Sequence, residues 1–178
     1  MFHKFSRLVV VLGAFSALAA PVAQADPPSK TLTTTVIVPG TAGPVSQGGT
    51  GFIDTGIILE PGQTATITAT GVVDACGGAC PAGPDGAAPP FFGVGPVIPI
   101  APAGALVGEV GTAPWQVLGS GPTVVSGSGD LLLGTQDGYD WSDNSGSFTV
   151  TITQPCTPGN GFGDTSHLHC GPPGQNKA

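Results

Sequence analysis

The stretch SFTVTIT, residues 147–153, alternates polar and apolar side chains more cleanly than any other part of this 178-residue chain. Phe148, Val150 and Ile152 fall on one side of an extended strand, and the serine and threonines between them fall on the other. This period of two is typical of a strand that packs one face on a core and exposes the other. The segment therefore predicts a half-buried β-strand.

Similar but weaker patterns precede it. The chain has 30 glycines and 19 prolines, which favour turns and short strands over helices. The segments 52–59 and 64–73 flank a Pro61-Gly62 turn, so we expect them to pair as an antiparallel hairpin. We predict an all-β fold, a single jelly-roll or β-sandwich domain of about 7–8 short antiparallel strands. The strand candidates are 31–38, 52–59, 64–73, 104–111, 115–118, 123–125, 130–135 and 147–153.

The ends of the chain differ from this middle part. Residues 1–25 resemble a secretory signal peptide, with Lys4 and Arg7 before an apolar run and Ala23-Gln24-Ala25 as a cleavage pattern. The apolar run is shorter than the ~20 residues of a membrane span, and no second one follows, so no transmembrane segment is expected. We assign 26–153 to the β-sandwich domain and 154–178 to a Gly/Pro-rich, disulfide-tied tail. The protein is predicted to be secreted.

The net charge of the chain argues against two classes of partner, nucleic acids and anionic lipid surfaces. Without the signal, two lysines remain against eleven acids, a formal charge of −9. Nucleic-acid binding relies on Lys and Arg to neutralise phosphates, so we expect no nucleic-acid partner. The same balance disfavours anionic lipid surfaces.

Four cysteines suit an oxidising compartment, where two disulfides are expected. Sequence leaves three connectivities open, and local pairing, Cys76 with Cys80 and Cys156 with Cys170, is favoured because each pair shares one Gly/Pro-rich segment. A zinc site built from Cys76 and Cys80 with the tail residues His167 and His169 is the alternative.

The segment QDGYDWSDNSG, residues 136–146, which we call the acidic loop, contains the polar side chains that could bind a ligand. Its three carboxylates, Asp137, Asp140 and Asp143, have no cationic side chain near them in sequence. Carboxylates this close repel one another unless they are solvated, protonated or neutralised by a cation. With Asn144 they offer the oxygen ligands that Ca²⁺ prefers, whereas Mg²⁺ demands a stricter octahedron. The alternative is a loop whose Asp and Asn side chains only cap backbone amides.

The aromatic rings of this loop, Tyr139 and Trp141, could stack on the apolar faces of a sugar, or fold back onto the domain. Catalytic motifs are missing from the sequence: there is no Gly-x-Ser-x-Gly and no His-Glu-x-x-His. A glycosidase pair such as Glu109 with Asp137 lacks any supporting motif. We therefore expect a binding protein and not an enzyme.

The order of several short segments resembles the PA-IL-type galactophilic lectins of bacteria. The similarity spans roughly residues 50–153. Near its end it includes the Asn-Ser-Gly-Ser-Phe run, residues 144–148, where the acidic loop leads into the last predicted strand. The segments are Asp54-Thr55-Gly56-Ile57, Pro61-Gly62-Gln63, Ile67-x-Ala69-x-Gly71, Gly83-Pro84-Asp85-Gly86, Gly104-Ala105-Leu106-Val107 with Gly111, and Asp137 followed by 143–150.

This resemblance implies a jelly-roll sandwich with one Ca²⁺ that itself binds sugar hydroxyls. It implies that Asp137, Asp143 and Asn144 are side-chain ligands, and that Asp140 and Ala75 supply backbone carbonyls. Asp137 and Asp143, through the ion, and the rings of Tyr139 and Trp141 would then contact the sugar.

Two features differ from the family pattern. The acidic loop is about one residue shorter than the family's loop. Where the family has a sugar-contacting His and Gln, this chain has 89–93, PPFFG. The sequence thus predicts a secreted, calcium-dependent, lectin-like protein of undetermined sugar specificity. The alternative is a structural or adhesive surface protein that binds calcium but no sugar.

Overall fold

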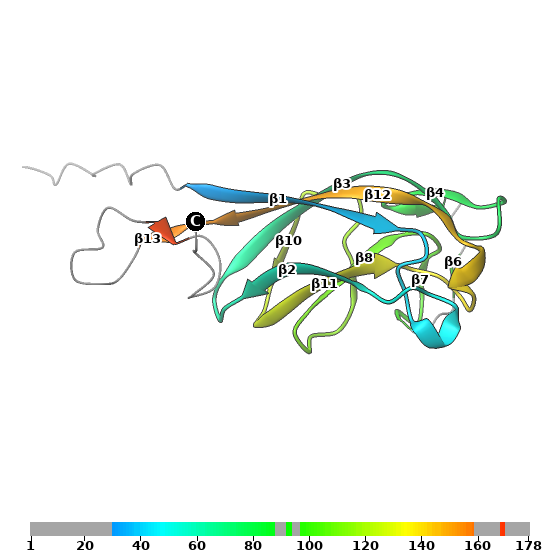
Figure 1. Ribbon diagram of the computed structural model, residues 1–178, viewed down its shortest axis with the longest axis horizontal. Coiled ribbons are helices and arrows are strands. Elements are labelled where there is room, and N and C mark those ends of the chain that lie inside the picture. The colour runs from blue at the N-terminus through cyan, green and yellow to red at the C-terminus, as the bar shows by residue number, and fades with distance from the viewer. Residues whose placement is uncertain (1–29, 88–91, 94–96, 159–167, 170–178) are drawn as a thin grey trace, which may run out of the picture.

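The computed structural model describes residues 30–87, 92–93, 97–158 and 168–169 (Figure 1). Within them the chain is built of antiparallel strands and two short 3-10 helices, η1 (Val45–Gln47) and η2 (Trp141–Asp143). No helix in this described part is long and apolar enough to cross a membrane. The predicted signal, residues 1–25, lies outside the described residues.

Two sheets form the body of the domain. The six-stranded sheet has the order β1-β12-β3-β4-β5, and β10 also pairs with β3. Its strands are β1 (Thr31–Pro39), β3 (Thr64–Asp74), β4 (Pro81–Gly83), β5 (Gly86–Ala87), β10 (Thr123–Ser126) and β12 (Ser145–Pro155).

The four-stranded sheet has the order β2-β11-β8-β9. It contains β2 (Ile53–Leu59), β8 (Leu106–Val110), β9 (Gln116–Val117) and β11 (Gly129–Thr135). Two small pairs, β6 (Phe92–Gly93) with β7 (Ala101–Pro102) and β13 (Thr157–Pro158) with β14 (Leu168–His169), lie outside these sheets. The predicted all-β sandwich is confirmed.

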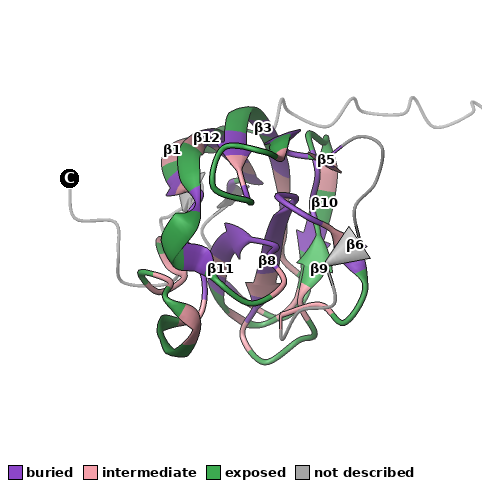
Figure 2. Ribbon diagram, turned by 90° about the vertical axis from the view of Figure 1, so that its right-hand side faces the viewer, coloured by how far each residue is buried: buried purple, intermediate pink, exposed green. Residues whose placement is uncertain are grey.

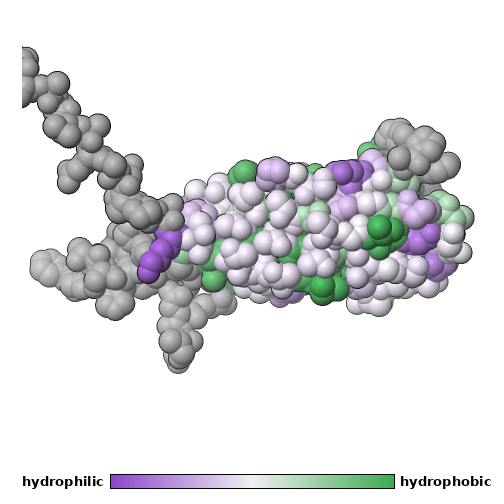
Figure 3. Space-filling view, turned by 90° about the horizontal axis from the view of Figure 1, so that it is seen from above, coloured by the Kyte–Doolittle hydropathy of each residue, from purple (hydrophilic) through white to green (hydrophobic). Residues whose placement is uncertain are grey.

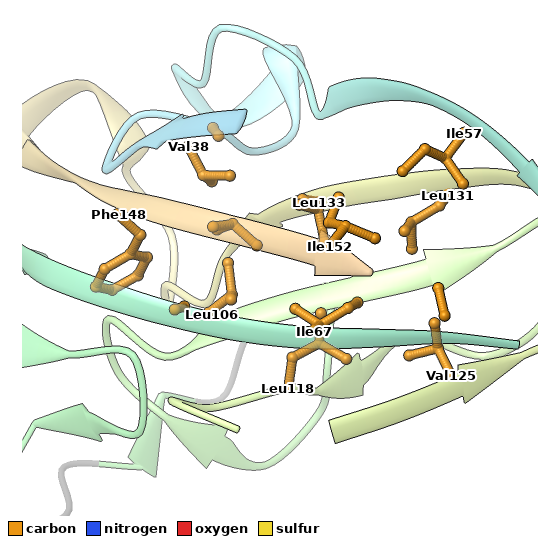
Figure 4. Close-up of a cluster of buried hydrophobic side chains, with 14 of the residues drawn as sticks. Val38, Ile57, Ile67, Leu106, Leu118, Val125, Leu131, Leu133, Phe148 and Ile152 are labelled. Atoms are coloured by element: carbon orange, nitrogen blue, oxygen red, sulfur yellow. The ribbon is translucent and has the colours of Figure 1, made fainter. Parts of the chain in front are cut away.

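The core lies between the two sheets. Phe148, Val150 and Ile152 of β12 are fully buried, as their alternation predicts, and they pack with residues such as Ile67 and Leu133 (Figure 4). Viewed from the end of the sandwich, buried positions are concentrated on the strands around the centre and exposed positions lie mostly at the periphery (Figure 2). At ~25 cal/mol per Å² of buried apolar surface, this shared core is the main stabilising contribution to the fold.

The hairpin predicted for 52–59 and 64–73 is wrong. Both strands form close to the expected bounds, but β2 lies in the four-stranded sheet and β3 in the six-stranded sheet. The Glu60–Gln63 turn does close, with the Gln63 N–H donating to the Glu60 carbonyl at 2.9 Å. It connects the two layers, because each strand turns its apolar side to the same core from opposite sides.

The cysteines behave as disulfides. Cys76 and Cys80 are bonded, with their Cα atoms 5.2 Å apart, so the predicted pairing is confirmed and these two residues are not zinc thiolates. Cys156 is also disulfide-bonded, and Cys170, its predicted partner, lies outside the described residues. Strand β12 continues to Pro155, two residues beyond the predicted boundary at 153. The segment 74–103, in which no strand was predicted, carries the short strands β4 to β7.

Candidate functional site

The acidic loop joins β11 to β12, which belong to different sheets, so it crosses the end of the sandwich. The helices η1 and η2 and the short β6 and β7 lie at this same end, on the right in Figure 1. A loop between two well-formed strands is a rigid place for a site, because both of its ends are fixed by ladders.

Trp141 anchors the loop to the domain. Its ring is fully buried, and its indole Nε1–H donates to the carbonyl of Thr135 at 3.1 Å. The indole also lies directly over Gly43, where a Cβ would collide with the ring. The prediction that Trp141 stacks on a sugar is therefore wrong: the ring has no exposed face, and its hydrogen bond is made inside the protein.

The carbonyl of Gly40, just after β1, binds both ends of the loop. The Thr135 hydroxyl donates to it at 2.7 Å, and the Asn144 side-chain amide donates to it at 3.0 Å. This shared acceptor fixes the orientation of the Asn144 side chain. Its Nδ2 donates to the Gly40 carbonyl, and its Oδ1 accepts no hydrogen bond among the described residues.

Asp137 and Asn144, like Gln136, are buried polar residues of the loop, with 8% and 7% of their surfaces exposed. One oxygen of Asp137 accepts the N–H of Gly138. The other, Oδ2, and the Oδ1 of Asn144 are both buried without a hydrogen-bond partner in the described part of the chain. Buried polar atoms are almost always paired, and each unpaired one costs about 1–3 kcal/mol. Two such acceptors in one loop point to a missing positive partner.

The pKa of Asp137 is raised, as expected for a buried carboxylate. Burial raises the pKa of its carboxyl, and the charges of Asp143 and Asp140 raise it further, while the Asn144 side chain and the Gly138 N–H partly oppose the shift. A bound cation would reverse the shift, because it stabilises the ionised carboxylate.

Asp140 uses its side chain locally. It caps η2, accepting the N–H of Ser142 at 2.9 Å and the Ser142 hydroxyl at 2.6 Å. These hydrogen bonds lower the pKa of its carboxyl. Its Oδ1 lies 3.0 Å from where a Cβ of Gly48 would be, against the turn that follows η1. Both hydrogen bonds use Oδ1, and the group that the lectin resemblance implies as the ion ligand is the Asp140 backbone carbonyl.

Asp143 is exposed and faces another loop. Its Oδ2 lies 3.4 Å from the position of a Cβ on Gly77, inside the Cys76–Cys80 disulfide loop. Ala75 is buried at the start of that loop, and its carbonyl accepts no hydrogen bond among the described residues. The implied ligands Asp143 and Ala75 thus belong to adjacent segments.

Asp74, which the sequence reasoning missed, organises the disulfide loop. Its carboxylate accepts the N–H groups of Cys76 at 3.0 Å, Gly78 at 2.8 Å and Cys80 at 3.2 Å. Those backbone hydrogen bonds lower the pKa of Asp74. An Asp two residues before a Gly-rich loop is the signal that could have identified it, because Asp side chains commonly bond the backbone two residues on.

Gln136 is a second residue that was missed. It is fully buried, its Nε2 donates to the Ile98 carbonyl at 2.9 Å, and its Oε1 accepts the Ile98 N–H at 3.3 Å. It therefore holds the returning end of the long 88–100 segment beside the acidic loop. The side chains of 89–93, which occupy the family's sugar-contacting positions, lie outside the described residues.

The three carboxylates do not converge. Among the described residues, no group of three or more His, Cys, Asp and Glu side chains could hold a metal ion. At this end of the sandwich the fold places a mixed set of oxygens: one buried carboxylate, one buried amide oxygen, an exposed carboxylate and backbone carbonyls that accept no hydrogen bond among the described residues. Such mixed sets suit Ca²⁺.

The two remaining predicted site residues, Tyr139 and Glu109, lie in different parts of the domain. Tyr139 is 72% exposed at the loop tip and is free to contact a ligand. Glu109 lies opposite Leu132 in the ladder of β8 and β11, whereas Leu106, opposite Thr135, marks the end next to the acidic loop. Glu109 is thus three strand positions away from that end, roughly 10 Å, and it does not form a carboxylate pair with Asp137.

Comparison with known family models and with curated proteins finds no match. Among solved structures, the N-terminal domain of EclA, described as a PllA-like lectin, is similar, with 22% sequence identity and a TM-score of 0.50. The match covers 68% of this chain and 95% of that one. The chain therefore has a lectin-like β-sandwich fold.

Proposed function

We propose that this protein is a secreted, non-catalytic, calcium-dependent carbohydrate-binding protein. The observation that carries the proposal is the pair of buried, unpartnered oxygens, Asp137 Oδ2 and Asn144 Oδ1. Because they are both acceptors, they need a donor or a cation, and among the described residues no basic side chain lies in the loop. An exported protein meets calcium outside the cell, which makes Ca²⁺ the natural partner.

Asp137, Asn144 and Asp143 would hold the ion by their side chains, and Asp140 and Ala75 by their carbonyls. When bound, Ca²⁺ supplies coordination positions that water or the hydroxyl groups of a sugar can fill. The chain's own contribution is to hold Asp137 and Asn144 dry and oriented through Trp141 and Gly40.

Carbohydrate as the ligand class is supported by the lectin-like fold and by the exposed Tyr139 ring at the loop tip. An aromatic face beside polar oxygen ligands suits a sugar, whose C–H face stacks while its hydroxyls bind the polar groups. The signal-like segment 1–25 and the disulfides support secretion.

Titration of Ca²⁺ into chelator-treated protein by calorimetry tests the ion site. We expect a saturable heat and a higher melting temperature with calcium, because a ligand that binds only the native state stabilises it. The absence of both effects would refute the calcium site.

The replacement of the family's sugar-contacting residues by Pro and Phe favours a second candidate, a structural or adhesive protein that binds calcium but no sugar. A glycan array in calcium buffer separates the two. Binding that disappears with chelator supports the lectin function, and silence across the array with intact calcium binding supports the second candidate.

A further inference from the structure

Strand β1 forms one edge of the six-stranded sheet and pairs only with β12 among the described residues. The register is continuous from Thr31 opposite Pro155 to Pro39 opposite Ser147, without a bulge. The other sheet edges are shorter or irregular: β5 and β9 have two residues each, and the pairing of β2 is interrupted by a register shift.

The hydrogen bonds at both ends of β1 show which of its backbone groups are free. The N–H of Cys156 donates to the Lys30 carbonyl at 2.7 Å, and the N–H of Gly40 donates to the Gly146 carbonyl at 3.0 Å. Opposed residues of an antiparallel pair alternate between bonded and non-bonded positions. Even-numbered residues of β1 therefore bond to β12, and Thr33, Thr35 and Ile37 point their N–H and C=O groups away from the sheet.

Within the described part of the chain, this edge lacks the usual protection against pairing. Natural edge strands are shielded by charged residues, bulges, proline or a covering segment. From 31 to 38 the strand reads TLTTTVIV, without a charge or a proline. No hydrogen bond to the free groups of Thr33, Thr35 and Ile37 occurs within the described part of the chain. A strand with these properties is a template for another strand.

We propose that two copies of this chain associate by antiparallel pairing of their β1 strands, about a two-fold axis at Thr35. Thr35 then pairs with Thr35 of the second copy, and Thr33 pairs with Ile37. Because all three are odd-numbered, their free N–H and C=O groups meet as bonded pairs. Pro39, which has no N–H, falls opposite Thr31 and ends the ladder.

The side chains favour a second copy over an unrelated strand. In this register Leu32, which is 39% exposed, lies opposite Val38, the one buried residue of β1. Lys30 falls opposite Gly40, so no like charges meet. The outer face of the joined sheet continues the cross-strand row of Thr35, Thr151 and Thr68. The face of the domain seen from above is mostly of intermediate hydropathy, with separate apolar patches (Figure 3).

The pairing has a consequence for ligand binding that does not depend on which ligand is bound. The acidic loop lies at the end of the sandwich where β1 finishes, so the antiparallel dimer carries its two candidate sites at opposite ends. Such a dimer can bridge two surfaces, and avidity then exceeds the affinity of one site.

Sedimentation equilibrium of the purified protein tests the dimer. We expect a dimer whose dissociation constant is weakened at least tenfold by Thr35→Lys, which places two ammonium groups opposite each other across the axis. Thr68→Lys is the matched control: Thr68 is exposed in the same cross-strand row, on β3, and should leave the dimer unchanged. Thr35→Pro should also abolish the dimer while sparing the ladder to β12, because the Thr35 N–H is not used there.

Hydrogen exchange gives a second measurement on the unmodified chain. The amides of Thr33, Thr35 and Ile37 should be protected at high protein concentration and exchange rapidly on dilution. A monomer at concentrations up to about 1 mM would overturn the proposal. So would a dimer that survives Thr35→Lys and Thr35→Pro, or one in which these three amides stay unprotected.

Discussion

Replacing Asp137 by Asn removes the buried charge of the acidic loop while keeping its shape. In the wild-type protein, Ca²⁺ at 100 times its dissociation constant should add about 2.7 kcal/mol to the free energy of unfolding. For a domain of this size, about 2–4 °C per kcal/mol converts this to a rise of ~5–11 °C in melting temperature. Asp137→Asn should lose that rise, because an amide is a much weaker ligand than a carboxylate for a hard cation.

In chelator, the relative stability of the two proteins should reverse, so that Asp137→Asn is more stable than the wild type. The amide carries no charge, so the variant no longer buries a carboxylate whose Oδ2 has no hydrogen-bond partner among the described residues. Since each unsatisfied group costs about 1–3 kcal/mol, we expect Asp137→Asn to be at least ~1 kcal/mol more stable than the wild type in chelator. The cross-over between the two conditions is the signature of this site.

Differential scanning calorimetry of both proteins, with calcium and with chelator, measures the cross-over. Asp130→Asn is the control, since it makes the same charge change at the opposite, exposed end of β11. A calcium-dependent rise that persists in Asp137→Asn would refute the assignment of Asp137. A variant less stable than the wild type in chelator would refute the argument from unpaired oxygens.

Three further outcomes are expected. In chelator the contribution of Asp137 to stability should increase as the pH falls through its raised pKa and level off below its ordinary value near 3.8, because protonation removes a buried charge. Thermal melts at several pH values measure this as the difference from Asp137→Asn, which retains the other carboxyl groups, including Asp74 and Asp140 with their lowered pKa values. Gly43→Ala should destabilise the fold by about 1–3 kcal/mol in urea unfolding, because its methyl group overlaps the buried Trp141 ring, and an unchanged midpoint would contradict that packing. Tyr139→Ala should weaken sugar binding about 2- to 10-fold on a glycan array and leave the calcium titration unchanged, since the ring is exposed and would act only by stacking; equal loss of both would place Tyr139 in the ion site.

Much of the fold follows from local pattern. The alternation of Phe148, Val150 and Ile152 correctly predicts which face of β12 is buried, and the short Cys76–Cys80 spacing correctly predicts a disulfide. The fate of Trp141 could not be predicted in the same way. An aromatic ring in a polar loop suits either a ligand or the core, and the choice depended on Gly43, nearly a hundred residues earlier, leaving room for the indole.

For the candidate site too, sequence predicted the position of the loop, and the structure was needed to distinguish its residues. Sequence identified the loop at 136–146 and its oxygen-bearing side chains, and only the family resemblance distinguished Asp140, as a carbonyl ligand, from Asp137 and Asp143. The structure separates them: Asp140 caps η2, Asp143 faces the disulfide loop, and Asp137 is buried with Asn144.

The all-β class, the strand positions and the acidic loop could be predicted from local pattern, because side-chain alternation and turn residues act over a few positions. The folded structure was needed to place β2 and β3 in different sheets, and to show that Asp137 and Asn144 each bury one oxygen without a partner among the described residues. A period of two specifies which face of a strand avoids water, but not which strand lies beside it. The desolvation of a carboxylate likewise depends on segments that the chain brings together only when it folds.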